Sequence, residues 1–184
     1  IPYCVTDIRQ SAFSNCTNLK KVNFGKSVRM LGSDCFYNCK SLTKLNFPIN
    51  LKSIRWGLIS GTSIKTLNIG RKISHINPYA MDTNTLEKIV VNKLNRHYSN
   101  KDGVLYNKKK TALVICPRAI KKTELKIPDT VKKININAFL MNKNLKKIIL
   151  PKALTKIEDN AFASCKKLKE ITIPKKVQTI RWCA

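Results

Sequence analysis

The segment LTKIEDNAFASCKKLKEITIPKK, residues 154–176, is one complete copy of a pattern that recurs along the chain. The segment before it, VKKININAFLMNKNLKKIILPKA at residues 131–153, aligns with it without a gap. Two further copies stand in tandem near the start, at residues 5–27 and 28–50. Because the pattern returns every 23 residues, the sequence predicts a solenoid in which each repeat forms one coil.

Apolar residues keep fixed positions within the 23-residue repeat. Positions 1 and 4 are apolar, Ala-Phe stands at positions 8 and 9, and position 12 holds Cys, Asn or Thr. A leucine at position 15 and apolar residues at positions 18 and 20 follow, as in Leu168, Ile171 and Ile173. Pro or Gly often stands at position 21. The segment L-x-x-(V/L/I)-x-(F/L/I) is the strand segment of a leucine-rich repeat.

The residues around this strand segment follow the pattern AF-x-x-C-x-x-L-x-x-I-x-(I/F)-P, which resembles the BspA-like leucine-rich repeat family. The resemblance covers nearly the whole chain. It implies a secreted or cell-surface protein of a host-associated bacterium or protozoan parasite. Such proteins are implicated in adhesion to host cells and matrix proteins, so the resemblance implies a part of an adhesin.

We therefore expect a single leucine-rich repeat solenoid domain over residues 1–184, made mostly of β-strands and turns with little helix. The strands of successive coils should pair as a stacked parallel β-sheet, with positions 15, 18 and 20 pointing inward. Positions 1 and 4 should return on the opposite side, with the Phe at position 9 between them. The repeats start at residues 5, 28, 51, 73, 131, 154 and 177. Since the chain begins without Met and stops partway through a repeat, we expect both ends to be truncated.

The register of the repeats breaks once, between Ile73 and Val131. We expect an insert at about residues 93–122. Within it, two apolar and β-prone segments at 103–106 and 111–115 flank the polar residues 107–110, which predicts a β-hairpin. The sequence DGVLYN at its start is similar to a hairpin insert of BspA-like proteins.

The chain is strongly basic, with 36 Lys and Arg against 10 Asp and Glu and a net charge of +26. This charge favours anionic partners such as an acidic glycan, an acidic protein surface or nucleic acid. The alternative is that the lysines only keep a solenoid surface soluble. No apolar run is long enough to predict a membrane span.

The sequence offers few residues that could serve as catalytic groups or metal ligands. Cys16, Cys39 and Cys165 at position 12 and Cys35 at position 8 are predicted to be small buried residues, not a disulfide framework or metal cage. Cys4, Cys116 and Cys183 have no predicted role. Carboxylates are scattered, and no glycine loop suits a phosphate. We expect no enzyme, catalytic residue, metal or cofactor; a site around His97 in the insert is the least favoured alternative.

The candidate binding surface is the outward side of the strands, at positions 17 and 19. Its residues are Lys21, Asn23, Lys44, Asn46, Thr66, Asn68, Lys88, Lys147 and Glu170. This face is rich in Lys and Asn, so we expect it to bind a host or matrix protein or an acidic glycan. The alternative is an ordinary solvated strand face.

A second candidate contact site combines Arg55 and Trp56 with Tyr106 and Lys108 of the insert. Arg-Trp recurs at residues 181–182, where each Trp either stacks on a partner or covers its neighbouring coil. An alternative function is an intracellular basic scaffold that binds nucleic acid or acidic partners; the few aromatic residues make nucleic acid the less favoured ligand. Apolar coil ends also predict end-to-end self-association.

Overall fold

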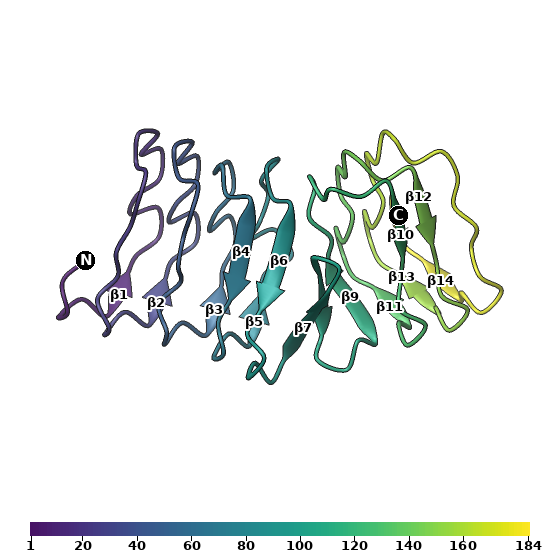
Figure 1. Ribbon diagram of the computed structural model, residues 1–184, viewed down its shortest axis with the longest axis horizontal. Helices are drawn as coiled ribbons and strands as arrows, with labels where there is room; N and C mark the ends of the chain where they lie inside the picture. The colour runs from purple at the N-terminus through teal and green to yellow at the C-terminus, as the bar shows by residue number, and fades with distance from the viewer. The chain divides into compact units, whose positions relative to one another are not determined.

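The computed structural model describes residues 1–184, which form coils of turns and short strands with no helix (Figure 1). The chain divides into two compact units, Ile1–His97 and Tyr98–Ala184, which we call the N-terminal unit and the C-terminal unit. Within each unit, strands of successive coils pair in parallel. These pairings confirm the predicted solenoid. None of its segments is a helix long and apolar enough to span a bilayer.

The N-terminal unit contains strands on two sides of its coils. At repeat positions 3 and 4, β1 (Asp7–Ile8) pairs with β2 (Met30–Leu31), and β3 (Ser53–Ile54) pairs with β5 (His75–Ile76). The L-x-x-L segments form β4 (Thr66–Ile69) and β6 (Lys88–Val91), which lie side by side in Figure 1. The corresponding residues 19–24 and 42–47 form no strand, although Leu42 and Leu45 are buried there as predicted.

The C-terminal unit begins with three antiparallel strands, β7 (Tyr98–Lys101), β8 (Val104–Asn107) and β9 (Ala112–Ile115). The hairpin of β8 and β9 is the one predicted, and β7 is an additional strand. On its other side, β9 pairs in parallel with β11 (Lys133–Ile134), followed by β13 (Lys156–Ile157) and β14 (Thr179–Ile180). β10 (Glu124–Lys126) pairs in parallel with β12 (Lys147–Ile149).

These pairings show that residues 112–126 form a coil of the solenoid. From the sequence, most of these residues were expected to belong to the insert at about 93–122. This coil is hard to recognise for two physical reasons. Ile115 and Cys116 stand where the neighbouring coils have Ala and Phe, and both are buried in their place. The coil also spans fewer residues between its strands: 112 to 124, against 133 to 147 in the next coil.

Five of the coils turn through two residues with positive φ, at positions 7 and 11 of the repeat. These positions hold mostly Asn, Asp, Ser and Gly, the residues that best tolerate this conformation. The pairs are Ser11/Asn15, Asp34/Asn38, Gly57/Gly61, Asn137/Met141 and Asn160/Ser164. Between them, backbone N–H groups donate to the next coil, as Phe13 does to the carbonyl of Cys35 at 3.0 Å and Phe139 to that of Ala161 at 2.8 Å. Backbone hydrogen bonds thus join the turns from coil to coil.

The core follows the repeat pattern closely. Phe36 and Phe139 at position 9 are fully buried, and their rings stack on those of Phe13 and Phe162, with centroids 5.5 and 5.1 Å apart. The predicted inward face is buried in Leu67 and Ile89 of the strands and in Leu154 and Ile157 on the opposite side. Each coil therefore buries its apolar residues against the next coil, as a solenoid requires.

The position-12 residues that are buried or half-buried hydrogen-bond to the backbone. Cys39 Sγ donates to the carbonyl of Phe13 at 3.0 Å, and Cys165 Sγ to that of Phe139 at 3.1 Å. Asn142 Nδ2 donates to the carbonyl of Pro117 at 3.0 Å. All seven cysteines are free, and Cys35, Cys39 and Cys116 are buried. Cys16 was expected to be buried but is exposed, because its coil packs against a neighbour on one side only; Cys165 is half-buried.

Candidate functional site

Most residues of the predicted binding face in the N-terminal unit are exposed. Lys21, Asn23, Lys44, Asn46, Asn68 and Lys88 are exposed and Thr66 is half-buried; we call these seven residues the outer strand face. The pairing of β4 with β6 sets Thr66 beside Lys88 and Asn68 beside Val90. Leu67 and Ile89, between them in sequence, are buried. In β4 and β6, the alternation of a β-strand thus places Thr66, Asn68, Lys88 and Val90 on the outer side of the coils.

Part of the outer strand face is hollowed. The hollow has a volume of about 330 Å³ and is lined by Asn46, Phe47, Asn68, Ile69, Gly70, Val90 and Asn92. The side-chain amides of Asn46 and Asn68 make no hydrogen bond within the protein, so each offers donors and an acceptor to a ligand. Phe47 and Val90 add apolar contact area. The volume is at the lower end of the range that binds small molecules or single residues of a larger ligand.

In the C-terminal unit the same column carries alternating charge. Lys147 stands between Glu124 of β10 and Glu170, with which it forms an isolated parallel bridge. The predicted residues Lys147 and Glu170 are both exposed, but the column Glu124, Lys147, Glu170 is not a lysine ladder. Sequence reasoning missed Glu124, which follows the expected insert at 93–122, because the coil that contains it was not recognised as a full repeat. The unbalanced positive column is therefore confined to the N-terminal unit.

The second candidate contact site is only partly at the surface. Tyr106 is 1% exposed and packs in the core of the C-terminal unit, so its assignment as a contact residue was wrong. Burial raises the pKa of its phenol and keeps it neutral. The reason is that β8 is covered on both faces, and its apolar run VLY is a core strand, not an exposed one. Lys108, in the turn after β8, is exposed.

Trp56 covers a neighbouring coil, which is one of the two alternatives predicted for it. Its ring stacks on that of Tyr79, with centroids 4.5 Å apart and an interplanar angle of 29°. About half of Trp56 remains accessible, since the residue is 51% exposed. Trp182, at the equivalent position, is exposed, and its backbone N–H donates to Asp159 Oδ1 at 3.1 Å.

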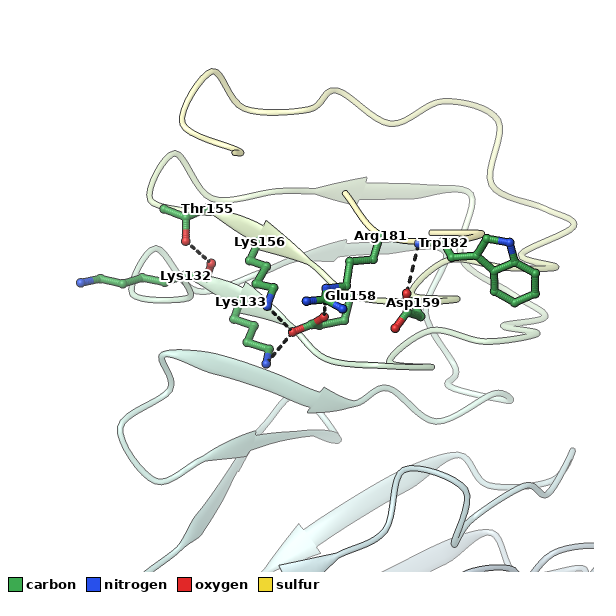
Figure 2. A network of polar contacts seen from close by, with 8 residues as sticks. All are labelled: Lys132, Lys133, Thr155, Lys156, Glu158, Asp159, Arg181 and Trp182. Carbon is green, nitrogen blue, oxygen red and sulfur yellow. Dashed lines mark hydrogen bonds and ion pairs between the residues drawn. The ribbon is translucent and has the colours of Figure 1, made fainter. Parts of the chain in front are cut away.

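A polar network in the C-terminal unit centres on Glu158 (Figure 2). The buried carboxylate accepts from Lys133 Nζ at 2.7 Å, Lys156 Nζ at 3.0 Å and Arg181 Nε at 2.9 Å. Burial by itself would raise the pKa of Glu158, but the hydrogen bonds and charges of Lys133 and Lys156 outweigh it and lower the pKa. A carboxylate held ionised by three cations is a poor general acid or base, so we assign the network to stability.

The residues of this network occupy equivalent positions of successive repeats, and this is how the sequence could have revealed it. Lys133 and Lys156 share position 3, and Glu158 and Arg181 share position 5 of successive coils. Reading positions 3 and 5 down the coils, instead of along one repeat, would have brought these residues together. Phe47 and Asn92, which line the hollow of the outer strand face, could likewise have been found only by comparing equivalent positions in successive coils.

The remaining chemistry is sparse. No group of three or more His, Cys, Asp or Glu is placed to hold a metal ion. His75 and His97 are both exposed, and burial raises the pKa of the Cys35 thiol to about 12. A thiol with so high a pKa is a weak nucleophile at neutral pH.

Coils of this pattern with an exposed polar strand face define a leucine-rich repeat scaffold, a class of protein that typically carries no catalytic site and serves in protein interactions. The chain belongs to the family described as BspA type leucine rich repeat region, whose model matches six copies over residues 1–110 and 116–184. This membership confirms the resemblance read from the sequence.

Solved structures of bacterial leucine-rich repeat proteins are similar to this chain. One from Eubacterium ventriosum is 35% identical, with a TM-score of 0.85 over 95% of this chain and 47% of that one. The pneumococcal vaccine antigen PcpA is 27% identical, with a TM-score of 0.85 over 94% of this chain and 44% of that one. This chain thus spans less than half the length of these two relatives. Comparison with curated proteins gave no significant match.

Proposed function

We propose that this chain is a non-catalytic recognition segment of a secreted or cell-surface adhesin, which binds a host or matrix protein or glycan through the outer strand face. The observation that carries the proposal is the hollow between Asn46 and Asn68, whose free amides are flanked by exposed lysines. The family membership and the similarity to a protein described as a vaccine antigen support the surface location.

The chemistry of this face suits a ligand that is polar and extended. Asn amides bond equally well to hydroxyl groups of a sugar and to the backbone of a peptide. The lysines at position 17 add attraction for carboxylates or sulfates and speed the encounter. Successive strands lie about 4.8 Å apart, so one ligand chain can contact several coils at once.

The experiment is a binding survey of immobilised matrix proteins and glycans by biolayer interferometry over a series of salt concentrations. The test variant is Asn46→Ala/Asn68→Ala. The matched control is Asn18→Ala/Asn84→Ala, which removes two exposed amides of the same unit away from the hollow. Since neither pair carries charge, the comparison isolates the amides from the net charge.

We expect at least one protein or glycan to bind at physiological salt, the test variant to weaken it about tenfold or more, and the control to retain it. If the test variant and the control bind equally well, the outer strand face is not the binding site. If single-stranded DNA and all acidic probes bind alike and dissociate together as salt rises, the charge acts only as a diffuse field and the proposal fails.

A further inference from the structure

A second hollow lies in the N-terminal unit, among the turns that lead from one coil to the next. It has a volume of about 600 Å³ and is lined by Lys52, Arg71, Lys72, Ser74, Leu94, Arg96 and His97. We call it the basic hollow. Four of its seven residues are Lys or Arg, and none is Asp or Glu. It shares no residue with the outer strand face, and its argument does not depend on the proposed function.

A buried amide holds the basic hollow together. Asn95 is fully buried, and its Nδ2 donates to the carbonyls of Gly70 and Ile73, both at 2.8 Å. Its Oδ1 accepts from the backbone N–H of His97 at 2.8 Å. These bonds fasten residues 95–97 to the turn at 70–73. They bring Arg96 into the same hollow as Arg71, although the two residues are far apart in sequence.

The cations of the hollow are not neutralised by carboxylates. Lys72 Nζ donates to Asn50 Oδ1 at 2.7 Å, which is a neutral acceptor. Lys52, Arg71 and Arg96 are exposed and take part in no ion pair. Like charges that converge on one hollow repel one another, and an anion with several charges relieves this repulsion. Arginine adds a planar fork of donors that matches the oxygens of a sulfate or phosphate group.

We propose that the basic hollow binds a ligand that carries several sulfate or phosphate ester groups. Its volume is within the range of small-molecule sites and exceeds what a single oxyanion fills. No Phe, Tyr or Trp side chain lines it, and stacking on the large aromatic rings is the usual means of holding nucleobases. The hydrogen bonds of Asn95 fix the backbone on both sides of the hollow, so the backbone that carries Arg71 and Arg96 needs no reordering when the ligand binds.

The test is isothermal titration of the whole chain in about 0.15 M salt. The probes are a fully sulfated hexasaccharide, the same hexasaccharide without sulfate, and inorganic tripolyphosphate. The test variant is Arg71→Gln/Arg96→Gln. The control, Arg9→Gln/Lys40→Gln, removes two positive charges from exposed positions of the same unit outside the hollow. All four side chains are exposed, so circular dichroism should report an unchanged fold.

We expect one of the charged probes to bind with a single-site isotherm, the test variant to weaken it at least about tenfold, and the control to stay within about twofold. Preference for the sulfated hexasaccharide identifies a sulfated glycan as the source of the groups, and preference for tripolyphosphate identifies a phosphate ligand. The proposal is overturned if neither charged probe binds, if the unsulfated hexasaccharide binds equally well, or if test and control lose affinity alike.

Discussion

Arg181 Nε donates to Glu158 Oε2 at 2.9 Å, so that an arginine on one coil neutralises a buried carboxylate on the coil before it. Glu158 also accepts from Lys133, one coil earlier still, and from Lys156 of its own coil. A single carboxylate therefore bridges three successive coils (Figure 2). In a solenoid each coil contacts only its neighbours, so such a bridge adds directly to the interface energy between coils.

Glu158→Gln should destabilise the C-terminal unit, because it leaves three cations around a neutral side chain. Breaking a buried ion pair costs several kcal/mol. Since the lysines and Arg181 are partly exposed and screened by water, we expect about 1–3 kcal/mol. Urea unfolding followed by circular dichroism measures the change. Glu170→Gln, an exposed carboxylate, is the control and should change the free energy by less than about 0.5 kcal/mol.

The same network predicts a pH dependence. The pKa of Glu158 is lower in the folded protein than the ordinary value of 4.5, so the folded state binds its proton less readily than the unfolded state. Its stabilisation is therefore complete above about pH 4.5 and is lost as the pH falls through the lowered pKa. The gap in urea midpoint between wild type and Glu158→Gln should narrow from pH 7 to pH 3. A gap that stays constant over this range contradicts the assignment.

Asn95 is expected to be one of the most sensitive polar residues of the N-terminal unit. Asn95→Ala leaves the carbonyls of Gly70 and Ile73 and the N–H of His97 without their partner. Because buried polar groups without partners are costly, the loss should be about 2–4 kcal/mol in chemical denaturation. Asn84→Ala, at an exposed position, serves as the control. An equal effect of the two substitutions would show that the anchoring is dispensable.

Cysteine reactivity should separate into two groups. Cys4, Cys16 and Cys183 are exposed, whereas Cys35, Cys39 and Cys116 are buried. Burial also raises the pKa values of the three buried thiols, so that little thiolate forms at neutral pH. Under native conditions a thiol reagent such as Ellman's reagent should label the exposed group quickly, and the buried group only after unfolding. Rapid labelling of Cys35 or Cys39 in the native state is the contrary result.

The periodic part of the fold could be predicted because each coil repeats the same packing problem. An inward position accepts only apolar residues, and a left-handed position favours Asn, Asp, Ser or Gly, so the pattern is visible in one sequence. The coil of β9 and β10 was not predicted, because it has fewer residues between its strands and has Ile115 and Cys116 in place of Ala-Phe. The coil keeps buried residues at these two positions, but it does not keep the Ala-Phe motif.

The candidate sites were predictable only where they follow the strand period. The outer strand face does so, since positions 17 and 19 alternate with buried residues. The basic hollow does not, because its cations come from turns and from residues 95–97, which lie outside the regular repeat. Only the hydrogen bonds of Asn95 bring Arg96 to the turn that carries Arg71. Such a site depends on tertiary contacts that no spacing in the sequence encodes.

Position 12 of the repeat offers a direct test of why Asn and Cys alternate there. Asn142 donates to the carbonyl of Pro117 at 3.0 Å and accepts from the N–H groups of Asn144 at 3.1 Å and Leu145 at 2.9 Å. Cys39 and Cys165 only donate, each to one carbonyl. Asn142→Ala removes all of these bonds and should cost about 2–3 kcal/mol in urea unfolding. Asn142→Cys keeps a weak donor of similar size and should cost about half as much. If Cys is no better than Ala at this position, the thiol contributes only volume, and the sulfur–carbonyl contacts of Cys39 and Cys165 carry no energy.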